Sequence, residues 1–219
     1  MKLTFRAIQK EEDEKYAKYL QETHNRFCSE SNLAIENVFT GDGYNSLKNE
    51  YMNDQLRIIM SDNHEGDYIA QIGIDSVFTD TTSLSSFIED GKVMMPYTSY
   101  EALYASKMPE GMKAGVKKNQ EMTSAVMNEE VEYEFARRMP IVYPREIFAE
   151  ARKFIEDIHK VTIEEYMSEL DMFNAYNFLG AFCYKYANDL FMWLNTEEMR
   201  LPPVPIEANL KAKDFVIVL

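Results

Sequence analysis

The sequence predicts an α+β protein that is predominantly helical, with a small mixed or antiparallel sheet covered by helices. Apolar residues recur at three- and four-residue steps through much of the C-terminal half, which indicates helices. Residues 68–78 alternate between apolar and polar, which indicates a strand with one buried face. The chain has 219 residues, of which 46% are hydrophobic, so it is long enough to bury a sizeable core.

The stretch from Thr162 to Leu194 is the element around which we expect the other elements to pack. Thr162 and Glu165 have the spacing of a capping box, which marks the start of a helix. From Met172 onward nearly every position is apolar or aromatic, which predicts one long, buried C-terminal helix. At about 1.5 Å per residue such a helix exceeds the width of a small domain. We therefore expect it to bend, to break near Gly180, or to reach beyond a single core.

A membrane span is the rival interpretation of this apolar run. Asn, Lys and Asp residues interrupt it, including Lys185 and Asp189, and charges are costly at bilayer depth. No cluster of Lys or Arg flanks the run. The sequence therefore favours a packed helix, and we expect no membrane association.

The N-terminal part is expected to contain a short entry strand, an amphipathic helix at 11–27 and a hairpin near 56–78. The hairpin prediction depends on two apolar runs, 56–60 and 68–78, and on the polar segment between them. Together with a short helix that ends near the Pro-Glu-Gly at 109–111, these elements form a predicted N-terminal α/β portion, 1–111.

Residues 112–128 contain three lysines among small residues, which indicates an exposed loop or a flexible connection. Residues 131–135 fit a strand and a helix equally well, so both alternatives stay open. Pro144 is expected to stand in the first turn of a helix that runs to about His159. The last portion, 129–219, is thus predicted to be helical with a closing strand, within what we expect to be one compact domain overall.

The formal net charge of −14 makes the surface strongly acidic. Each contact with a phosphate requires a cation, so we expect no direct binding to nucleic acid. An acidic surface suits a basic protein partner, mimicry of nucleic acid, or solubility alone. Cys28 and Cys183 lack a paired spacing, and no signal peptide is evident, so we expect reduced thiols and a cytoplasmic location, or a virion if the chain is phage-encoded.

Catalytic motifs are sparse. Glu156 and His159 match the Glu-x-x-His pair of di-metal centres, but no second such pair exists in the sequence. His24 and Cys28 lie one helical turn apart without the sequence signature of a cysteine enzyme. No glycine-rich phosphate-binding motif is present either. We therefore expect no cofactor and no bound metal.

The polar segment 62–67 holds the best candidates for an unrecognised catalytic site, namely His64, Asp62 and Glu65. A histidine beside two carboxylates is suited to acid–base chemistry or to cation binding. The segment lacks the ligand spacing of a calcium loop, so a solvated turn is the competing interpretation. An enzyme with an unfamiliar site is therefore the third functional hypothesis.

The first hypothesis is a non-enzymatic protein–protein interaction or assembly protein, for example a viral or phage structural component, that binds a protein partner or itself. Fourteen Met and fourteen Tyr residues provide adaptable apolar contact area. The second hypothesis is an acidic inhibitor or nucleic-acid mimic that binds a basic host protein such as a nuclease. The candidate interaction residues are Tyr184, Trp193, Phe215, Ile217, Leu219, Glu132 and Glu134.

Overall fold

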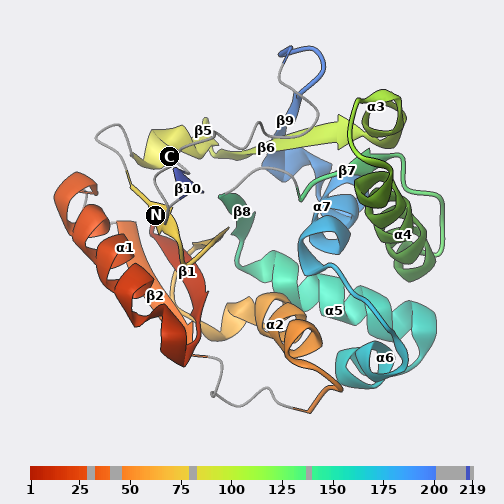
Figure 1. The fold of residues 1–219 in the computed structure, drawn as a ribbon, viewed down its shortest axis with the longest axis horizontal. Coiled ribbons are helices and arrows are strands. Elements are labelled where there is room, and N and C mark those ends of the chain that lie inside the picture. Colours follow the sequence, from red (N-terminus) through yellow and green to blue (C-terminus); the bar gives the residue numbers. More distant parts are fainter. Residues whose placement is uncertain (29–32, 40–45, 79–82, 137–139, 201–215, 218–219) are drawn as a thin grey trace.

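The structure is a computed structural model that describes residues 1–28, 33–39, 46–78, 83–136, 140–200 and 216–217 (Figure 1). The helices in these ranges are α1 (Glu14–Phe27), α2 (Glu50–Ile59), α3 (Tyr100–Ala105), α4 (Glu110–Met127), α5 (Glu146–His159), α6 (Ile163–Glu169) and α7 (Ala175–Tyr186). The strands are β1 (Leu3–Gln9), β2 (Leu33–Phe39), β3 (Tyr68–Ile72), β4 (Ser76–Val77), β5 (Ile88–Glu89), β6 (Lys92–Ser99), β7 (Tyr133–Glu134), β8 (Ile141–Pro144), β9 (Phe191–Asn195) and β10 (Val216–Ile217). The expected mixture of helices with small mixed sheets is confirmed.

The first sheet has the strand order β2-β1-β3-β8, with β1 parallel to both of its neighbours and β8 antiparallel to β3. On β1, Leu3, Phe5 and Ala7 are completely buried on one face, and Arg6 is 1% exposed on the other. A strand covered on both faces is typical of parallel sheets. Figure 1 shows α1 on one side of this sheet and α2 and α5 on the other, which accounts for the two-sided burial.

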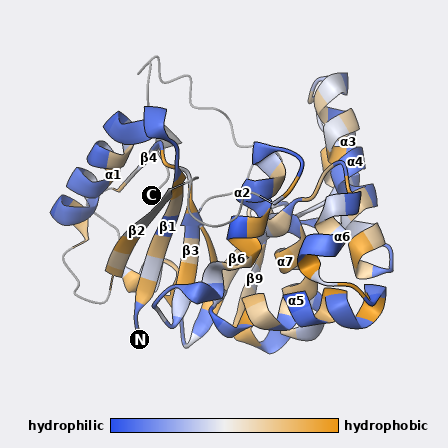
Figure 2. Ribbon diagram, turned by 90° about the horizontal axis from the view of Figure 1, so that it is seen from below, coloured by the Kyte–Doolittle hydropathy of each residue, from blue (hydrophilic) through white to orange (hydrophobic). Residues whose placement is uncertain are grey.

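The second sheet is centred on β6, which pairs antiparallel with β5 and β7 and parallel with β9. The register places Met95 of β6 opposite Trp193 of β9. Helices α3, α4 and α7 lie at the β7 end of this sheet (Figure 1). Figure 2 shows the hydrophobic strands in the interior and mainly hydrophilic positions along the outside of α1.

The prediction of one long C-terminal helix is wrong. The capping box at Thr162 and Glu165 is present, but α6 ends before Leu170, whose backbone is extended with ψ 148°. A new helix begins after Asn174, whose side chain accepts a hydrogen bond from the backbone N–H of Asn177. Gly180 lies inside this second helix rather than at a break.

The last four residues of the predicted helix, 191–194, belong to a strand. Phe191 to Asn195 form β9 and pair with β6, so their backbone groups are satisfied by a strand already in place. A run that is apolar on every side does not distinguish a buried helix from a buried strand. The neighbouring strand β6, almost 100 residues earlier in the chain, decides between them.

The predicted hairpin near 56–78 is also wrong. Residues 56–59 belong to α2, which begins with Asn49 as its N-cap, and the segment 61–63 is a short 3-10 helix. The strand at 68–72 does form, but it pairs with β1 and β8. The run 56–60 contains four apolar residues and Arg57, which is too short to show helical periodicity, and the polar segment after it resembles a hairpin turn.

Three further segments can be compared with their predictions. Residues 112–127 lie within α4, so the expected loop or flexible connection is wrong at this point. The ambiguous segment 131–135 contains the two-residue strand β7. The helices predicted at 11–27 and from Pro144 to about His159 are confirmed as α1 and α5. Within the described ranges, no helix is long and apolar enough to cross a membrane.

Candidate interaction surface

Four aromatic side chains from four separate elements meet at one end of the second sheet. We call Tyr97 of β6, Tyr133 of β7, Tyr184 of α7 and Trp193 of β9 the aromatic cluster. The ring centroids are 5.0 Å apart for Tyr97 and Tyr133, 5.1 Å for Tyr133 and Tyr184, and 4.9 Å for Tyr184 and Trp193. Each of the four residues is half-buried, so the rings pack against one another and still present surface to solvent.

Phe135 supports the cluster from the interior. It is 1% exposed, and its ring centroid lies 5.8 Å from that of Tyr184 and 5.7 Å from that of Trp193. Helix α7 can approach Phe135 this closely because residue 180 is glycine, and a Cβ there would overlap the Phe135 side chain. The glycine therefore determines how far the rings of β7 lie from those of α7.

Asn177 fixes α7 relative to three other elements. Its side chain is completely buried, and its Oδ1 accepts a hydrogen bond from the Phe135 N–H at 2.9 Å. Its Nδ2 donates to the hydroxyls of Tyr100 and Thr123, both at 2.8 Å. A buried amide with its donors and acceptor paired holds neighbouring elements in one arrangement. The cluster is thus built on a hydrogen-bonded frame.

The segment between α4 and β7 is also held in place. Asn128 ends α4 in the left-handed region with φ 53°. Gln120 donates from Nε2 to the carbonyl of Val131 at 2.8 Å, and the Val131 N–H donates to Ser124 Oγ at 3.0 Å. The Tyr100 N–H donates to the carbonyl of Glu132 at 2.9 Å. These bonds hold the backbone that carries the exposed side chain of Glu132.

A hollow of about 270 Å³ lies beside the aromatic cluster, and we call it the aromatic–acidic hollow. Its apolar lining consists of Tyr133, Phe135 and Tyr184 with Met127 and Ala181. Its acidic lining consists of Glu129, Glu130 and Glu132, all of which are exposed. Aromatic surface and carboxylates therefore meet in one concave site.

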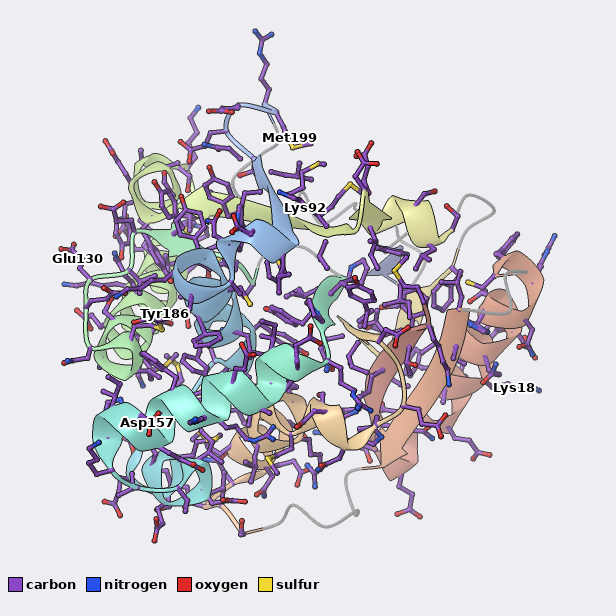
Figure 3. The ribbon with its side chains drawn as sticks, turned by 180° about the vertical axis from the view of Figure 1, so that it is seen from behind. Lys18, Lys92, Glu130, Asp157, Tyr186 and Met199 are labelled. Atoms are coloured by element: carbon purple, nitrogen blue, oxygen red, sulfur yellow. The ribbon has the colours of Figure 1, made fainter. Side chains whose placement is uncertain are left out.

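A second hollow of about 530 Å³ shares Glu129 and Glu130 with the first and adds Tyr104, Lys117 and Glu121. The two shared glutamates thus form a ridge between two depressions. Figure 3 shows Glu130 at the periphery of the molecule on the side of α4. The acidic ridge is therefore accessible from outside.

Of the three glutamates that line the aromatic–acidic hollow, Glu129 has a lysine partner among the described residues. Lys185 forms an ion pair with Glu129, and the hydrogen bond in this pair raises the pKa of Lys185. Neither Glu130 nor Glu132 takes part in an ion pair with any residue that the structure describes. Burial raises the pKa of Tyr133, and the nearby Tyr184 and Glu132 raise it further. Tyr133 therefore remains a neutral phenol at physiological pH and offers a ring and a hydroxyl rather than a phenolate.

The structure places the predicted interaction residues in different environments. Tyr184 and Glu132 line the hollow, and Trp193 stands behind it against Tyr184. Glu134 points inward instead, because it is 4% exposed and accepts a hydrogen bond from Asn119 Nδ2 at 3.1 Å. Ile217 belongs to β10, which pairs with β4. The other two, Phe215 and Leu219, lie outside the described residues.

Sequence reasoning missed Tyr97 and Tyr133 as members of the site. The strand-like alternation at 131–135 does place Tyr133 on the opposite side of its strand from Glu132 and Glu134. Nothing in the sequence connects Tyr97 to that segment, since their contact results from the pairing of β6 with β7. Only the sheet register brings these two rings together.

Of the candidate catalytic residues, His64 and Glu65 line one hollow, and Asp62 is not part of its lining. Asp62 receives two hydrogen bonds from Arg152, at 2.6 and 2.7 Å, which ties its carboxylate to α5. His64 and Glu65 line a separate hollow of about 320 Å³ together with Lys2, and Lys2 forms an ion pair with Glu65 at 3.2 Å. Among the described residues no group of His, Cys, Asp and Glu has the arrangement of a metal site. The carboxylates of Asp62 and Glu65 are thus each held in an ion pair within the fold.

A buried polar group on the first sheet also escaped prediction. Arg6 is 1% exposed and donates from Nη1 to the carbonyl of Arg57 at 2.7 Å and to the hydroxyl of Ser61. Gln71 donates to the same hydroxyl at 2.8 Å, and Arg57 pairs with Asp54 at 2.8 Å. These bonds tie β1 and β3 to α2. Since Arg6, Arg57, Ser61 and Gln71 are all buried and bonded to one another, the group is part of the core.

Comparisons with known proteins give no family and no relative from which to infer function. No protein-family model matches the chain. A search of curated proteins likewise finds no match. We therefore infer function from the geometry of the aromatic–acidic hollow.

Proposed function

We propose that this chain is a non-enzymatic protein-binding protein whose contact surface is the aromatic–acidic hollow with the aromatic cluster beside it. The observation that carries the proposal is the convergence of partly exposed tyrosines in one concave site with Glu130 and Glu132, which form no ion pair with the described residues. Tyrosine and tryptophan contribute large contact areas at protein interfaces, where a few such residues provide most of the binding free energy. The rings here are held by a rigid frame, which lowers the entropy lost on binding.

The test is to replace Tyr184 by Ala and to compare partner binding. Partners are first captured from the native source, then purified, and their affinity for each variant is measured directly. We expect Tyr184→Ala to weaken binding roughly 30-fold, the loss typical of a central aromatic contact. Tyr19→Ala is the control, because Tyr19 is 43% exposed on α1, on the other side of the molecule (Figure 1).

The proposal predicts that Tyr184→Ala and Tyr19→Ala differ in their affinity for the partner. Equal affinity of Tyr184→Ala and Tyr19→Ala for every purified partner would refute it. Circular dichroism of both variants shows whether the fold is intact, so that a loss of binding is not confused with unfolding. Light scattering of the wild-type chain alone shows whether the partner is another copy of the same chain.

An acidic inhibitor that imitates nucleic acid is the second candidate. The observation in its favour is the group of exposed glutamates at 129, 130 and 132, together with Glu121 in the second hollow. In such a decoy the charges alone carry the affinity, so Tyr184→Ala would leave binding unchanged and added salt would weaken it strongly. The effect of Tyr184→Ala on the affinity for a partner therefore distinguishes the two functions.

A further inference from the structure

We infer that the aromatic–acidic hollow accepts the cationic side chain of an arginine or lysine from a basic segment of the partner. This inference rests on the proposed function and specifies the chemistry of its partner. Four observations carry it: the ring faces, the unpaired carboxylates, the size of the hollow and the total charge of the molecule.

The rings offer the first part of a cation site. Tyr133 and Tyr184 line the hollow with their ring centroids 5.1 Å apart and their planes inclined at 52°. Both residues are half-exposed, so each ring retains surface that a ligand can cover. The face of an aromatic ring carries partial negative charge and attracts a guanidinium or ammonium group placed over it.

The carboxylates offer the second part. Glu130 and Glu132 line the same hollow, are exposed, and form no ion pair with the described residues. Lys185 also lines the hollow, but Glu129 already pairs with it. A guanidinium group can donate two parallel hydrogen bonds to a carboxylate while its plane stacks on a ring. The charges of Glu130 and Glu132 therefore lie beside the rings, where they could form an ion pair with a bound cation.

The same chemistry occurs within the molecule. Lys185 makes its ion pair with Glu129 while its Nζ lies 5.1 Å from the ring centroid of Tyr186. Lys185 thus contacts both a carboxylate and a tyrosine ring at the border of the hollow. A partner cation would repeat this arrangement with Glu130 or Glu132 and the rings of Tyr133 and Tyr184.

Size and charge exclude other occupants. A hollow of about 270 Å³ is smaller than most pockets for drug-sized ligands, which start near 300 Å³, and it suits one long side chain. A second copy of this chain would bring a net charge of −14 against the same carboxylates. An apolar helix would bury the carboxylates without a counter-charge. An arginine or lysine side chain satisfies all three constraints.

The experiment uses the indole of Trp193 as a reporter, because the chain contains a single tryptophan and its ring lies 4.9 Å from that of Tyr184. The intact protein, labelled with ¹⁵N, is titrated with a Gly-Ser peptide that carries three arginines. A matched peptide carries three citrullines, which keep the shape of arginine and lack its charge. We expect the arginine peptide to shift the indole N–H resonance, and the citrulline peptide to bind roughly 10-fold more weakly or not at all.

Charge variants separate a specific site from general attraction. Glu130→Gln with Glu132→Gln removes two charges at the hollow, and Glu11→Gln with Glu12→Gln removes the same charge beside α1 (Figure 1). We expect the first pair to weaken binding of the arginine peptide about 5-fold or more and the second to change it less than 2-fold. Equal weakening by both pairs, or equal binding of the citrulline peptide, would overturn the inference.

The inference and the proposed function fail in different ways. If the arginine peptide does not shift the indole resonance, but Tyr184→Ala still abolishes binding of a purified partner, the surface binds protein by neutral contacts and only the inference falls. If Tyr184→Ala leaves both peptide and partner binding unchanged, the proposed function falls as well.

Discussion

Gly180 lies where α7 passes closest to the side chain of Phe135, and the surface depends on that close approach. Asn177, one helical turn earlier, binds the backbone N–H of the same phenylalanine at 2.9 Å. Gly180 thus leaves room for the Phe135 side chain, and Asn177 anchors the Phe135 backbone. Neither touches the hollow, yet both determine where Tyr133 and Tyr184 stand relative to each other.

We predict that Gly180→Ala destabilises the protein by about 2 kcal/mol or more, because the new methyl group must displace Phe135 from a packed core. The matched control is Gly115→Ala in the interior of α4, where a Cβ meets nothing within 4 Å. That change should stabilise by up to about 1 kcal/mol, since Ala is the better helix former. Urea unfolding gives the free energy of unfolding of both variants. Similar values for the two would contradict the close contact between Gly180 and Phe135.

At the scale of elements, the division of 162–195 into α6, α7 and β9 has the largest effect on the site. Because the helix breaks before α7, α7 can pack beside the second sheet. The chain then returns as β9, which pairs with β6 and places Trp193 beside Tyr184. A continuous helix would have carried Trp193 away from β6. The turn from helix to strand therefore creates the aromatic cluster.

The two alternatives for this region make opposite predictions for Asn174→Ala. In the structure Asn174 is the N-cap of α7 and accepts from the Asn177 N–H at 3.0 Å, so its loss should cost about 1 kcal/mol. In a continuous helix the same change would stabilise by a few tenths of a kcal/mol, because Ala has the higher helix propensity. Thermal unfolding decides the sign, and Asn174→Ser should retain most of the cap.

At the scale of the whole molecule, both sheets join distant parts of the chain. In the first sheet β3 (68–72) pairs with β8 (141–144), and in the second β6 (92–99) pairs with β9 (191–195). The chain between the paired strands of one sheet thus runs through the other sheet. Strand β8 of the first sheet also lies next to β6 of the second, and α7 packs against α2 and α5 (Figure 1).

Because the two sheets share their connections, we predict a single cooperative unfolding transition. The fluorescence of Trp193 reports on the second sheet, and far-ultraviolet circular dichroism reports on the whole chain. Coincident urea midpoints by the two probes are expected of one cooperative unit. A fluorescence change that clearly precedes the loss of circular dichroism would show that the second sheet unfolds independently.

Local patterns in the sequence correctly predicted what depends on local physics. The amphipathic helices α1 and α5 follow from apolar residues at helical spacing, and the capping box at Thr162 follows from two side chains three residues apart. The net charge of −14, from which we expect a basic partner, follows from composition. Tyr184, Trp193 and Glu132 were recognised as candidate contacts because large aromatic and acidic side chains stand out in the sequence.

Tertiary structure alone decided the rest, because the deciding contacts lie far apart along the chain. The run at 191–195 became a strand since β6 offered a partner edge, although its apolar pattern suits a helix equally well. Glu134 is buried against Asn119 of α4, while Glu132, which precedes β7 on the same side of the chain, stays exposed, and this difference results from the packing of α4. The sequence thus determined which residue types were available for binding. The pairing of strands determined which of them share one surface.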